Sequence, residues 1–298
     1  MNIPRISRDH APAPITAEGA AGDFPAMLRR RGLLAPAPSL AAGAVQANQA
    51  GHPPLVQTEA TTILAFKFKG GIMMAGDRRA TAGNVVVYDR ADKVLEIDRH
   101  SLMAIAGVPA TAWEMARVLG HSFQFYRRSQ LQEMSMDGKV RTLSKLLRDN
   151  FGFVMQGVGA VVPIFATYDT VAKVPRLYFY DVMGAQFEAA DYAISGSGSP
   201  AVRSVLYYTN SFGGRPISRF GEEEALLLAL RALDTAAESD TATGGVDRHG
   251  RIYPIVKIIN EAGIVSLPDS VLANAYGQNL LTPSSPAKST SKQADSKP

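Results

Sequence analysis

The order of strand-like and helix-like segments between residues 61 and 270 restricts the fold more than any other feature of this sequence. The periodicity of the apolar residues predicts strands, two helices, further strands, two more helices and a closing strand pair. Two antiparallel sheets packed together, with a helix pair on each outer face, would bury every apolar face. We therefore expect an α+β fold, a four-layer α-β-β-α sandwich. The expected helices cover residues 112–126, 140–154, 200–209 and 221–238.

The segments on either side of this region have compositions that do not suit a packed core. Residues 1–60 are rich in Ala, Pro and Gly, and residues 281–298 are rich in Ser, Pro and Lys. Few large apolar side chains are present to offset the entropy lost on ordering, so both segments are expected to be mostly disordered. The stretch 27–47 faintly resembles a signal peptide, but its position and its internal prolines argue against one. We expect a single folded domain over residues 61–280.

Composition excludes several classes of function. The chain has no cysteine, which removes disulfides, thiolate metal sites and cysteine nucleophiles. No apolar stretch reaches the roughly 18–20 residues of a membrane-spanning helix. The net charge of +4 comes mainly from the two ends, because residues 61–280 hold 23 basic and 22 acidic side chains. A nearly neutral domain does not indicate a nucleic-acid partner.

Common catalytic and cofactor motifs are absent from the sequence. The five histidines are scattered without metal-ligand spacing, and no G-x-S-x-G elbow occurs. The glycine-rich SGSGSP at residues 195–200 lacks the lysine of a phosphate-binding loop and the pattern of a dinucleotide-binding turn. Serine–histidine chemistry and cofactor binding are therefore unsupported.

A threonine pair, Thr61-Thr62, begins the first strand-like run, TTILAFKF. A threonine hydroxyl is a poor nucleophile unless a base lies beside it, and an N-terminal threonine can use its own α-amine as that base. The same nitrogen inside a peptide bond cannot accept a proton. Thr61 would thus stay latent until residues 1–60 are removed, which would explain both the long lead and the hydroxyls at the head of a strand.

Three further segments accompany this pair: GDRR at 76–79, ADKVLEID at 91–98 and LMAIAG at 102–107. Together with TTILAFKFKGG they resemble the β subunit of the proteasome core particle, particularly its bacterial form. Asp77 lies 16 residues and Lys93 lies 32 residues after Thr61, which agrees with the family without a gap. The resemblance covers residues 61–270 and implies an N-terminal-nucleophile hydrolase fold.

The resemblance assigns roles to seven residues. Thr61 is the nucleophile and, through its freed α-amine, the base. Asp77 and Lys93 are its charged partners, and the Gly107 amide stabilises the oxyanion. An ammonium at Lys93 would depress the pKa of the amine, and Asp77 would hold that ammonium in place. SGSGS and DTATGG resemble the segments that hold the N-terminal amine, which adds Ser197, Asp240 and Thr243.

Each of these residues also has an ordinary structural explanation. Taken alone, Thr61 suits the start of a strand, Asp77 a turn and Lys93 an exposed strand position. SGSGS suits a loop, and DTATGG suits a helix end followed by a glycine turn. The agreement of the intervals in one chain favours the catalytic interpretation. Neighbouring strand side chains face opposite ways, so only one of Thr61 and Thr62 shares a face with the site, and the spacing selects Thr61.

The resemblance also implies a set of substrate contacts. The segment from Arg79 to Gly83 would hold the substrate as an extra strand through its backbone. Strand alternation puts Lys93 and Leu95 on one face, and small, uncharged residues at the pocket mouth favour apolar side chains before the cleaved bond. Pro109 and Trp113 suit a helix start and a core aromatic equally well. The expected contacts are Ala80, Thr81, Gly83, Ala91, Leu95, Ile105, Pro109 and Trp113.

One position departs from the family pattern. The family usually has Gly before the catalytic threonine, whereas this chain has Ala60. Self-cleavage needs a tight bend there, and Ala costs about 1–2 kcal/mol in left-handed conformations that glycine adopts freely. We expect autocatalytic cleavage at Ala60–Thr61 to be slower by roughly tenfold, not lost.

The resemblance implies a catalytic proteasome β subunit, a threonine endopeptidase that needs no cofactor or metal. The implied particle stacks two rings of seven β subunits between two rings of seven α subunits, works with a ring ATPase or other activator, and degrades unfolded polypeptides in the cytoplasm. Neither nucleic acid nor membrane is an implied partner. Three alternatives stay open: a non-catalytic β subunit that only builds the ring, which Ala60 slightly favours; the simpler two-ring bacterial relative, whose sequences are shorter and lack GDRR; and a small-molecule amidase of the same fold.

Overall fold

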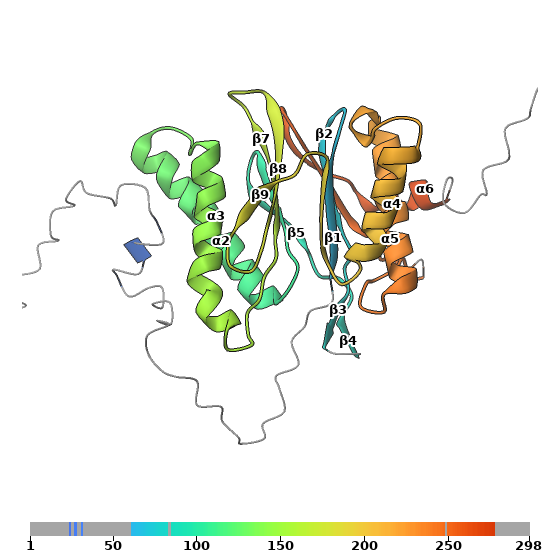
Figure 1. Ribbon diagram of the computed structural model, residues 1–298, viewed down its shortest axis with the longest axis horizontal. Coiled ribbons are helices and arrows are strands. Elements are labelled where there is room, and N and C mark those ends of the chain that lie inside the picture. Colours follow the sequence, from blue (N-terminus) through green and yellow to red (C-terminus); the bar gives the residue numbers. More distant parts are fainter. Residues whose placement is uncertain are drawn as a thin grey trace, which may run out of the picture.

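Two antiparallel sheets lie face to face between two helical layers in the computed structural model of this chain (Figure 1). The layers follow one another as helix pair, sheet, sheet and helix pair, so the predicted four-layer α-β-β-α sandwich is confirmed. The structure describes residues 61–82, 85–247 and 249–277, together with Phe24, Met27, Leu28 and Arg31.

The first sheet contains the strand that follows Thr61. Its strands are β1 (Thr62–Phe68), β2 (Gly71–Gly76), β10 (Tyr192–Gly196), β11 (Ile255–Asn260) and β12 (Gly263–Ser266). Their order is β10-β1-β2-β11-β12, and all neighbours are antiparallel. The period-2 alternation of β1 sends Leu64 and Phe66 to one helical layer and Ile63 and Ala65 toward the second sheet. Both faces of β1 are therefore buried.

The second sheet has the order β5-β6-β7-β8-β9 and is also antiparallel throughout. Its last strand lies at the sheet edge with all three residues exposed, and the sequence pattern does not predict it. A strand without a buried face has no apolar alternation to reveal it. The strands are β5 (Val94–Asp98), β6 (Ser101–Ala104), β7 (Ile164–Asp169), β8 (Val174–Tyr180) and β9 (Gln186–Glu188).

A separate two-stranded sheet, β3 (Ala80–Ala82) and β4 (Val85–Tyr88), projects beyond the end of β1 (Figure 1). All four residues of β4 are exposed, although three are valines and one is a tyrosine. This hairpin was not predicted as an element of its own, because four consecutive apolar residues do not show which face is buried.

Helices α2 (Pro109–Gln130) and α3 (Met136–Val154) cover the second sheet, while α4 (Ser199–Phe212) and α5 (Glu222–Ser239) cover the first (Figure 1). All four predicted helices are confirmed, with ends that differ by up to four residues. The short helix α6 (Asp269–Ala275) and the 3-10 turn η1 (Ile217–Arg219) were not predicted.

Local signals explain where these helices begin. Pro109 occupies the first position of α2, where its missing N–H costs nothing. The Ser135 hydroxyl accepts a hydrogen bond from the Gly138 amide at 3.2 Å at the start of α3. Three glutamates fill the first turn of α5, where negative charge is favourable. Pro109, at the start of α2, lies close to Thr61, since both line one small pocket.

Part of the lead contacts the folded domain. Phe24, Met27 and Leu28 are helical, and the ring of Phe24 lies 5.5 Å from that of Phe125 on α2. The remainder of residues 1–60 and all of residues 281–298, both expected to be mostly disordered, lie outside the described residues. No helix in the described part of the chain is long and apolar enough to span a membrane.

Candidate active site

Thr61 lies immediately before β1, at the end of the sheet from which the β3–β4 hairpin projects. It is only 4% exposed, and it lines one small pocket together with Lys93 and Gly107. The Thr61 carbonyl accepts a hydrogen bond from the Ser197 amide at 2.9 Å. Gly196, which pairs with Thr62 across the sheet, has φ of +99°, and a Cβ there would be 1.9 Å from the Thr61 carbonyl oxygen, so this close approach requires glycine.

Asp77 is fully buried directly after β2, and both of its carboxylate oxygens are held. Oδ1 accepts hydrogen bonds from Thr62 N at 2.8 Å and Lys93 Nζ at 2.7 Å. Oδ2 accepts from the amides of Arg79 and Gly244, both at 2.9 Å. Four donors on one buried carboxylate fix its position.

Lys93 is the buried cation of the site, with 5% of its side chain exposed. Its ammonium donates to Asp77 and also to the Arg79 carbonyl, at 2.5 Å. Burial lowers the pKa of Lys93 from its ordinary value, and the Asp77 carboxylate opposes this shift. The arrangement fixes a positive charge at the wall of the pocket that Thr61 lines.

Gly107 lies between β6 and α2 and forms an isolated antiparallel bridge with Val161. The hydrogen bonds of this bridge are Val162 N to the Ala106 carbonyl and Val108 N to the Ala160 carbonyl. Gly107 and Val161 are thus the non-hydrogen-bonded pair, so the Gly107 amide takes no part in the bridge and is directed away from it. Gly107 has φ of +111°, which also favours glycine at this wall of the pocket.

Ser197, Asp240 and Thr243 meet although they come from two segments that are far apart in the sequence. The hydroxyls of Ser197 and Thr243 both donate to Asp240 Oδ2, each at 2.6 Å. Partial burial raises the pKa of Asp240, but these two hydrogen bonds and one from the Ala242 amide outweigh it, leaving the pKa below its ordinary value. The Ser197 hydroxyl is also 3.4 Å from the Thr61 carbonyl oxygen, which connects this trio to the start of β1.

The sequence did not reveal the contacts that three further residues make at the site. The Arg79 backbone bridges Asp77 and Lys93, and its guanidinium donates to the carbonyl of Thr241 at 2.9 Å. The Gly244 amide donates to Asp77. The Thr62 hydroxyl contacts Thr243 Oγ1 at 2.5 Å. A backbone donor carries no sequence signal of its own. Arg79 and Gly244 nevertheless belong to GDRR and DTATGG, the segments that contain Asp77, Asp240 and Thr243, so their closeness in sequence to these residues could have indicated that they contact the site.

The expected substrate contacts are only partly brought together. Leu95 does not line this pocket but packs against the core under α2 and α3. Thr81 is buried in β3 and does not line it either, and Gly83 lies outside the described residues. The expected residues that do line the pocket are Ala80, Ala91, Ile105, Pro109 and Trp113.

The pocket also has a charged group that was not expected. Asp92 lines it with an exposed side chain, so the prediction of an uncharged mouth is wrong. Its Oδ1 accepts a hydrogen bond from the Val94 amide at 3.1 Å, and its backbone carbonyl accepts one from Trp113 Nε1 at 3.3 Å. Asp92 is adjacent to Lys93 in a loop, where no alternation indicated which way its side chain points.

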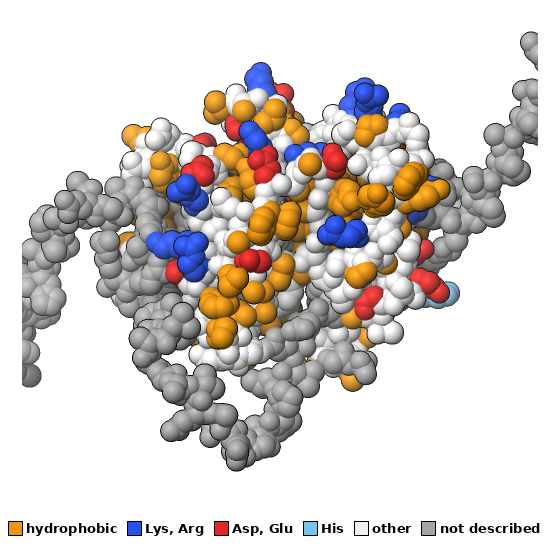
Figure 2. Space-filling model, in the orientation of Figure 1, with side chains coloured by type: hydrophobic (Ala, Val, Ile, Leu, Met, Phe, Trp, Pro, Cys, Tyr) orange, Lys and Arg blue, Asp and Glu red, His pale blue; other side chains and the backbone are white. Residues whose placement is uncertain are grey.

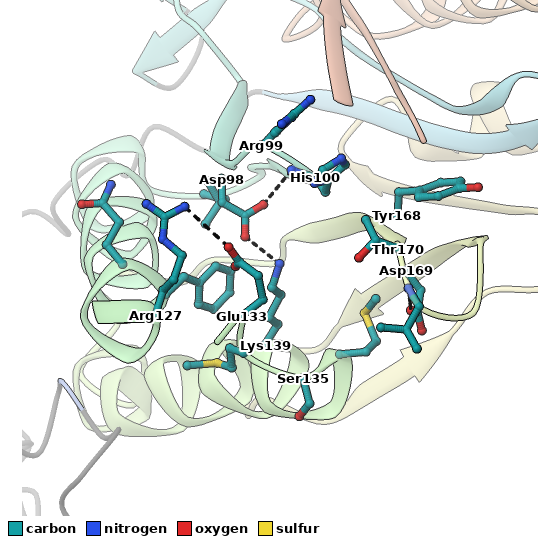
Figure 3. A pocket seen from close by; sticks show the side chains of 16 residues that line it. Asp98, Arg99, His100, Arg127, Glu133, Ser135, Lys139, Tyr168, Asp169 and Thr170 are labelled. Atoms are coloured by element: carbon teal, nitrogen blue, oxygen red, sulfur yellow. Dashed lines mark hydrogen bonds and ion pairs between the residues drawn. The ribbon is translucent and has the colours of Figure 1, made fainter. Parts of the chain in front are cut away.

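A larger cavity of about 510 Å³ lies elsewhere, between the second half of α2, the start of α3 and the turns after β5 and β7 (Figure 3). Four of its charged groups form two ion pairs: Lys139 Nζ is 2.6 Å from Asp98 Oδ2, and Arg127 is 3.5 Å from Glu133. Its Ser135 hydroxyl caps α3. None of the seven predicted catalytic residues lines it. In the described part of the chain, no group of three or more acidic or histidine side chains could hold a metal ion.

Comparison with known proteins identifies the family. A family model described as Proteasome subunit matches residues 58–250. Proteasome subunit beta of Acidothermus cellulolyticus is 35% identical over 277 residues, which cover 89% of this chain and 92% of that protein. Proteasome subunit beta 2 of Thermomonospora curvata is 40% identical over 222 residues, 74% of this chain and 77% of that protein. Proteasome subunit beta of Streptomyces griseus is 38% identical over 211 residues, 70% and 72% respectively.

The alignment with the Acidothermus protein is longer than residues 61–270, over which the resemblance was expected, so it includes part of the lead or of the tail. The matched family region contains Thr61, Asp77, Lys93 and the Ser197–Asp240–Thr243 cluster. With the sandwich fold and the site geometry described above, these matches show that the chain belongs to the proteasome subunit family, as a β subunit.

Proposed function

We propose that this chain is the catalytic β subunit of a bacterial proteasome core, a threonine endopeptidase whose nucleophile is Thr61. One observation carries the proposal: Thr61 shares a pocket with the Lys93 ammonium, which the fully buried Asp77 carboxylate holds at 2.7 Å. A buried ion pair is expensive to build, and replacing it by apolar residues is often neutral or stabilising. Its presence at the head of β1 therefore favours a chemical role over a structural one.

The reaction begins once the Ala60–Thr61 bond is cut and the Thr61 nitrogen becomes an amine. That amine takes the proton of the Thr61 hydroxyl as Oγ1 attacks the substrate carbonyl. The nearby Lys93 ammonium favours the deprotonated amine and the developing alkoxide. The Gly107 amide donates to the tetrahedral oxyanion, an effect worth about 3–4 kcal/mol in comparable sites.

Collapse of the tetrahedral intermediate breaks the peptide bond and leaves an ester on Thr61. The protonated amine gives its proton to the departing amine of the substrate. Water then attacks the ester with the same amine as the base, and the Thr61 hydroxyl is restored. In this scheme Ser197, Asp240 and Thr243 hold the backbone at the start of β1, through the contacts of Ser197 with the Thr61 carbonyl.

Assembly with α subunits and other β subunits follows from membership of the family. We propose seven-membered rings, with β rings stacked between α rings, a ring ATPase or other activator, and unfolded polypeptides as substrates in the cytoplasm. Exposed apolar surface on the chain supports assembly. Tyr207, Tyr208 and Phe212 of α4 are each more than half exposed, and hydrophobic side chains gather over this helix in Figure 2. The exposed strand β4 adds a second such surface.

The main alternative is a β subunit that builds the ring without catalysis, which Ala60 slightly favours. The intact Asp77–Lys93 pair weighs against it. The intact mass of the chain recovered from assembled particles, with a fluorogenic peptide assay on the same material, separates the two. We expect a chain that begins at Thr61 and hydrolyses peptides. A chain that still carries Ala60, or a particle with no peptidase activity, would contradict the proposal.

Asp92, an exposed acid that lines the pocket, leads to a prediction about specificity. Replacement of Asp92 by Asn should lower kcat/KM about 2- to 5-fold for peptides with Lys or Arg before the cleaved bond, because an exposed ion pair is worth up to about 1 kcal/mol. Peptides with Leu or Phe at that position should be unaffected. Asp89→Asn is the matched control, since Asp89 is also an exposed acid but does not line this pocket. Equal changes for basic and apolar peptides would exclude a specificity role for Asp92.

A further inference from the structure

Thr62 is fully buried on the face of β1 opposite to Thr61, yet its polar atoms contact three parts of the site. Its amide donates to Asp77 Oδ1 at 2.8 Å. Its hydroxyl oxygen accepts a hydrogen bond from the Gly198 amide at 3.1 Å and lies 2.5 Å from Thr243 Oγ1. Thr62 thus lies between the Asp77–Lys93 pair and the turn that leads into α4.

The direction of the hydroxyl contacts follows from counting protons. Thr243 has one hydroxyl proton and donates it to Asp240 Oδ2 at 2.6 Å. An ionised carboxylate can only accept, and the lowered pKa of Asp240 keeps it ionised at neutral pH. The Thr62 hydroxyl must therefore donate to Thr243 Oγ1. A directed chain runs from the Gly198 amide through Thr62 and Thr243 to Asp240, where Ser197 donates from the other side.

The close packing around Thr62 depends on a glycine at position 198, which makes room for these hydrogen bonds. A Cβ at Gly198 would lie 2.3 Å from Thr62 Oγ1 and 2.8 Å from Thr243 Oγ1, so the approach requires glycine at position 198. Ser197 precedes this glycine and holds the Thr61 carbonyl through its amide. Displacement of the Thr62 hydroxyl would release the turn on which Ser197 lies and thereby loosen the backbone of Thr61.

We propose that Thr62 is a positioning residue for peptide hydrolysis, whose hydroxyl holds Thr243, Asp240 and the Ser197–Gly198 turn in the arrangement that fixes Thr61. The inference rests on the function proposed above. Serine at this position would keep both hydrogen bonds, whereas valine keeps the shape and removes them. Loss of the hydroxyl leaves the Gly198 amide without its acceptor and Thr243 Oγ1 without the donor that orients it, although Thr243 still donates to Asp240. Shifts at the nucleophile then become possible, where misplacement by 1 Å can cost on the order of 100-fold in rate.

Peptidase kinetics of assembled particles test the inference. Thr62→Val should lower kcat about 10- to 100-fold with KM changed less than about twofold, because substrate binding does not involve Thr62. Thr62→Ser should recover most of kcat. A specific protease site placed before residue 61 in every variant removes the lead equally, so that processing does not affect the comparison. Thr62→Ala, which adds no methyl group beside the Gly198 amide, carries the same expectation if the valine variant fails to assemble.

Thr167→Val is the matched control. Thr167 is also fully buried, lies on β7 of the other sheet, and contacts the Ser101 hydroxyl at 3.2 Å. Its replacement should lower stability without changing kcat. The inference is overturned if Thr62→Val keeps wild-type kcat, if Thr62→Ser is as impaired as Thr62→Val, or if Thr167→Val loses as much activity. Wild-type activity after replacement of Thr61 would instead contradict the proposed function. Failure of this inference and failure of the proposed function can therefore be distinguished.

Discussion

Replacement of Thr61 by alanine is expected to lower kcat for peptide hydrolysis by about 10⁴-fold or more. The variant keeps the α-amine, the Lys93 ammonium and the Gly107 amide, but it has no atom that can form the ester intermediate. Removal of a covalent nucleophile in comparable peptidases leaves only the catalysis supplied by binding and by the oxyanion site. The measurement is the initial rate of fluorogenic peptide cleavage by assembled particles.

The retained lead is the confounding effect in this experiment, because Thr61 is also needed to remove residues 1–60. A specific protease site before residue 61 removes the lead from variant and wild type alike. Thr61→Ser, which keeps a hydroxyl beside the amine, should stay active. Thr235→Ala, on the exposed face of α5, controls for the loss of a threonine hydroxyl. The only hydrogen bond described for the Thr235 hydroxyl is with the Arg231 carbonyl of the same helix. Wild-type rates from a Thr61→Ala particle would disprove the threonine mechanism.

The contact between the start of β1 and Asp77 was predictable because it is local. A tight turn at Gly70 joins β1 and β2, and the register pairs Ile63 with Gly76. The residue after Gly76 therefore comes beside the start of β1, whatever packs around the sheet. A separation of 15 residues, from Thr62 to Asp77, becomes a contact through the hairpin alone. The fold could be predicted for a similar reason, since each layer has its own apolar period.

The rest of the site depends on tertiary packing that periodicity does not describe. Asp240 reaches Ser197 only because α5 lies over the first sheet and ends there. Alternation correctly gives Thr62 the face opposite Thr61, but it says nothing of hydrogen bonds made on that face. The family resemblance assigned Leu95 to the pocket, and alternation put it on the same face as Lys93. Alternation does not indicate how far along that face a pocket extends. At Leu95, two residues after Lys93, this face of β5 is already covered by the layer of α2 and α3.

Two lysine–aspartate pairs in the described part of the chain, one buried and one partly buried, allow a chemical role to be distinguished from a structural one. Lys93–Asp77 lies at the candidate site, with side chains 5% and 0% exposed. Lys139–Asp98 lies at the larger cavity (Figure 3), with side chains 10% and 20% exposed. Loss of one partner from a buried pair costs about 3–5 kcal/mol, because the other charge stays buried without compensation. Methionine matches the lysine stem in length without the charge.

Lys93→Met and Lys139→Met should therefore both lower the urea midpoint of unfolding, the second less because Asp98 is partly solvated. Their effects on peptide hydrolysis should differ completely. Lys93→Met removes the charge that favours the deprotonated Thr61 amine and the attacking oxygen, so kcat should fall by about 10³-fold or more. Lys139→Met should retain wild-type kcat per folded particle, because its pair does not contact the Thr61 pocket. Equal losses of kcat in the two variants would mean that Lys93 acts through stability alone. A direct role of the Lys93 charge in catalysis would then be excluded.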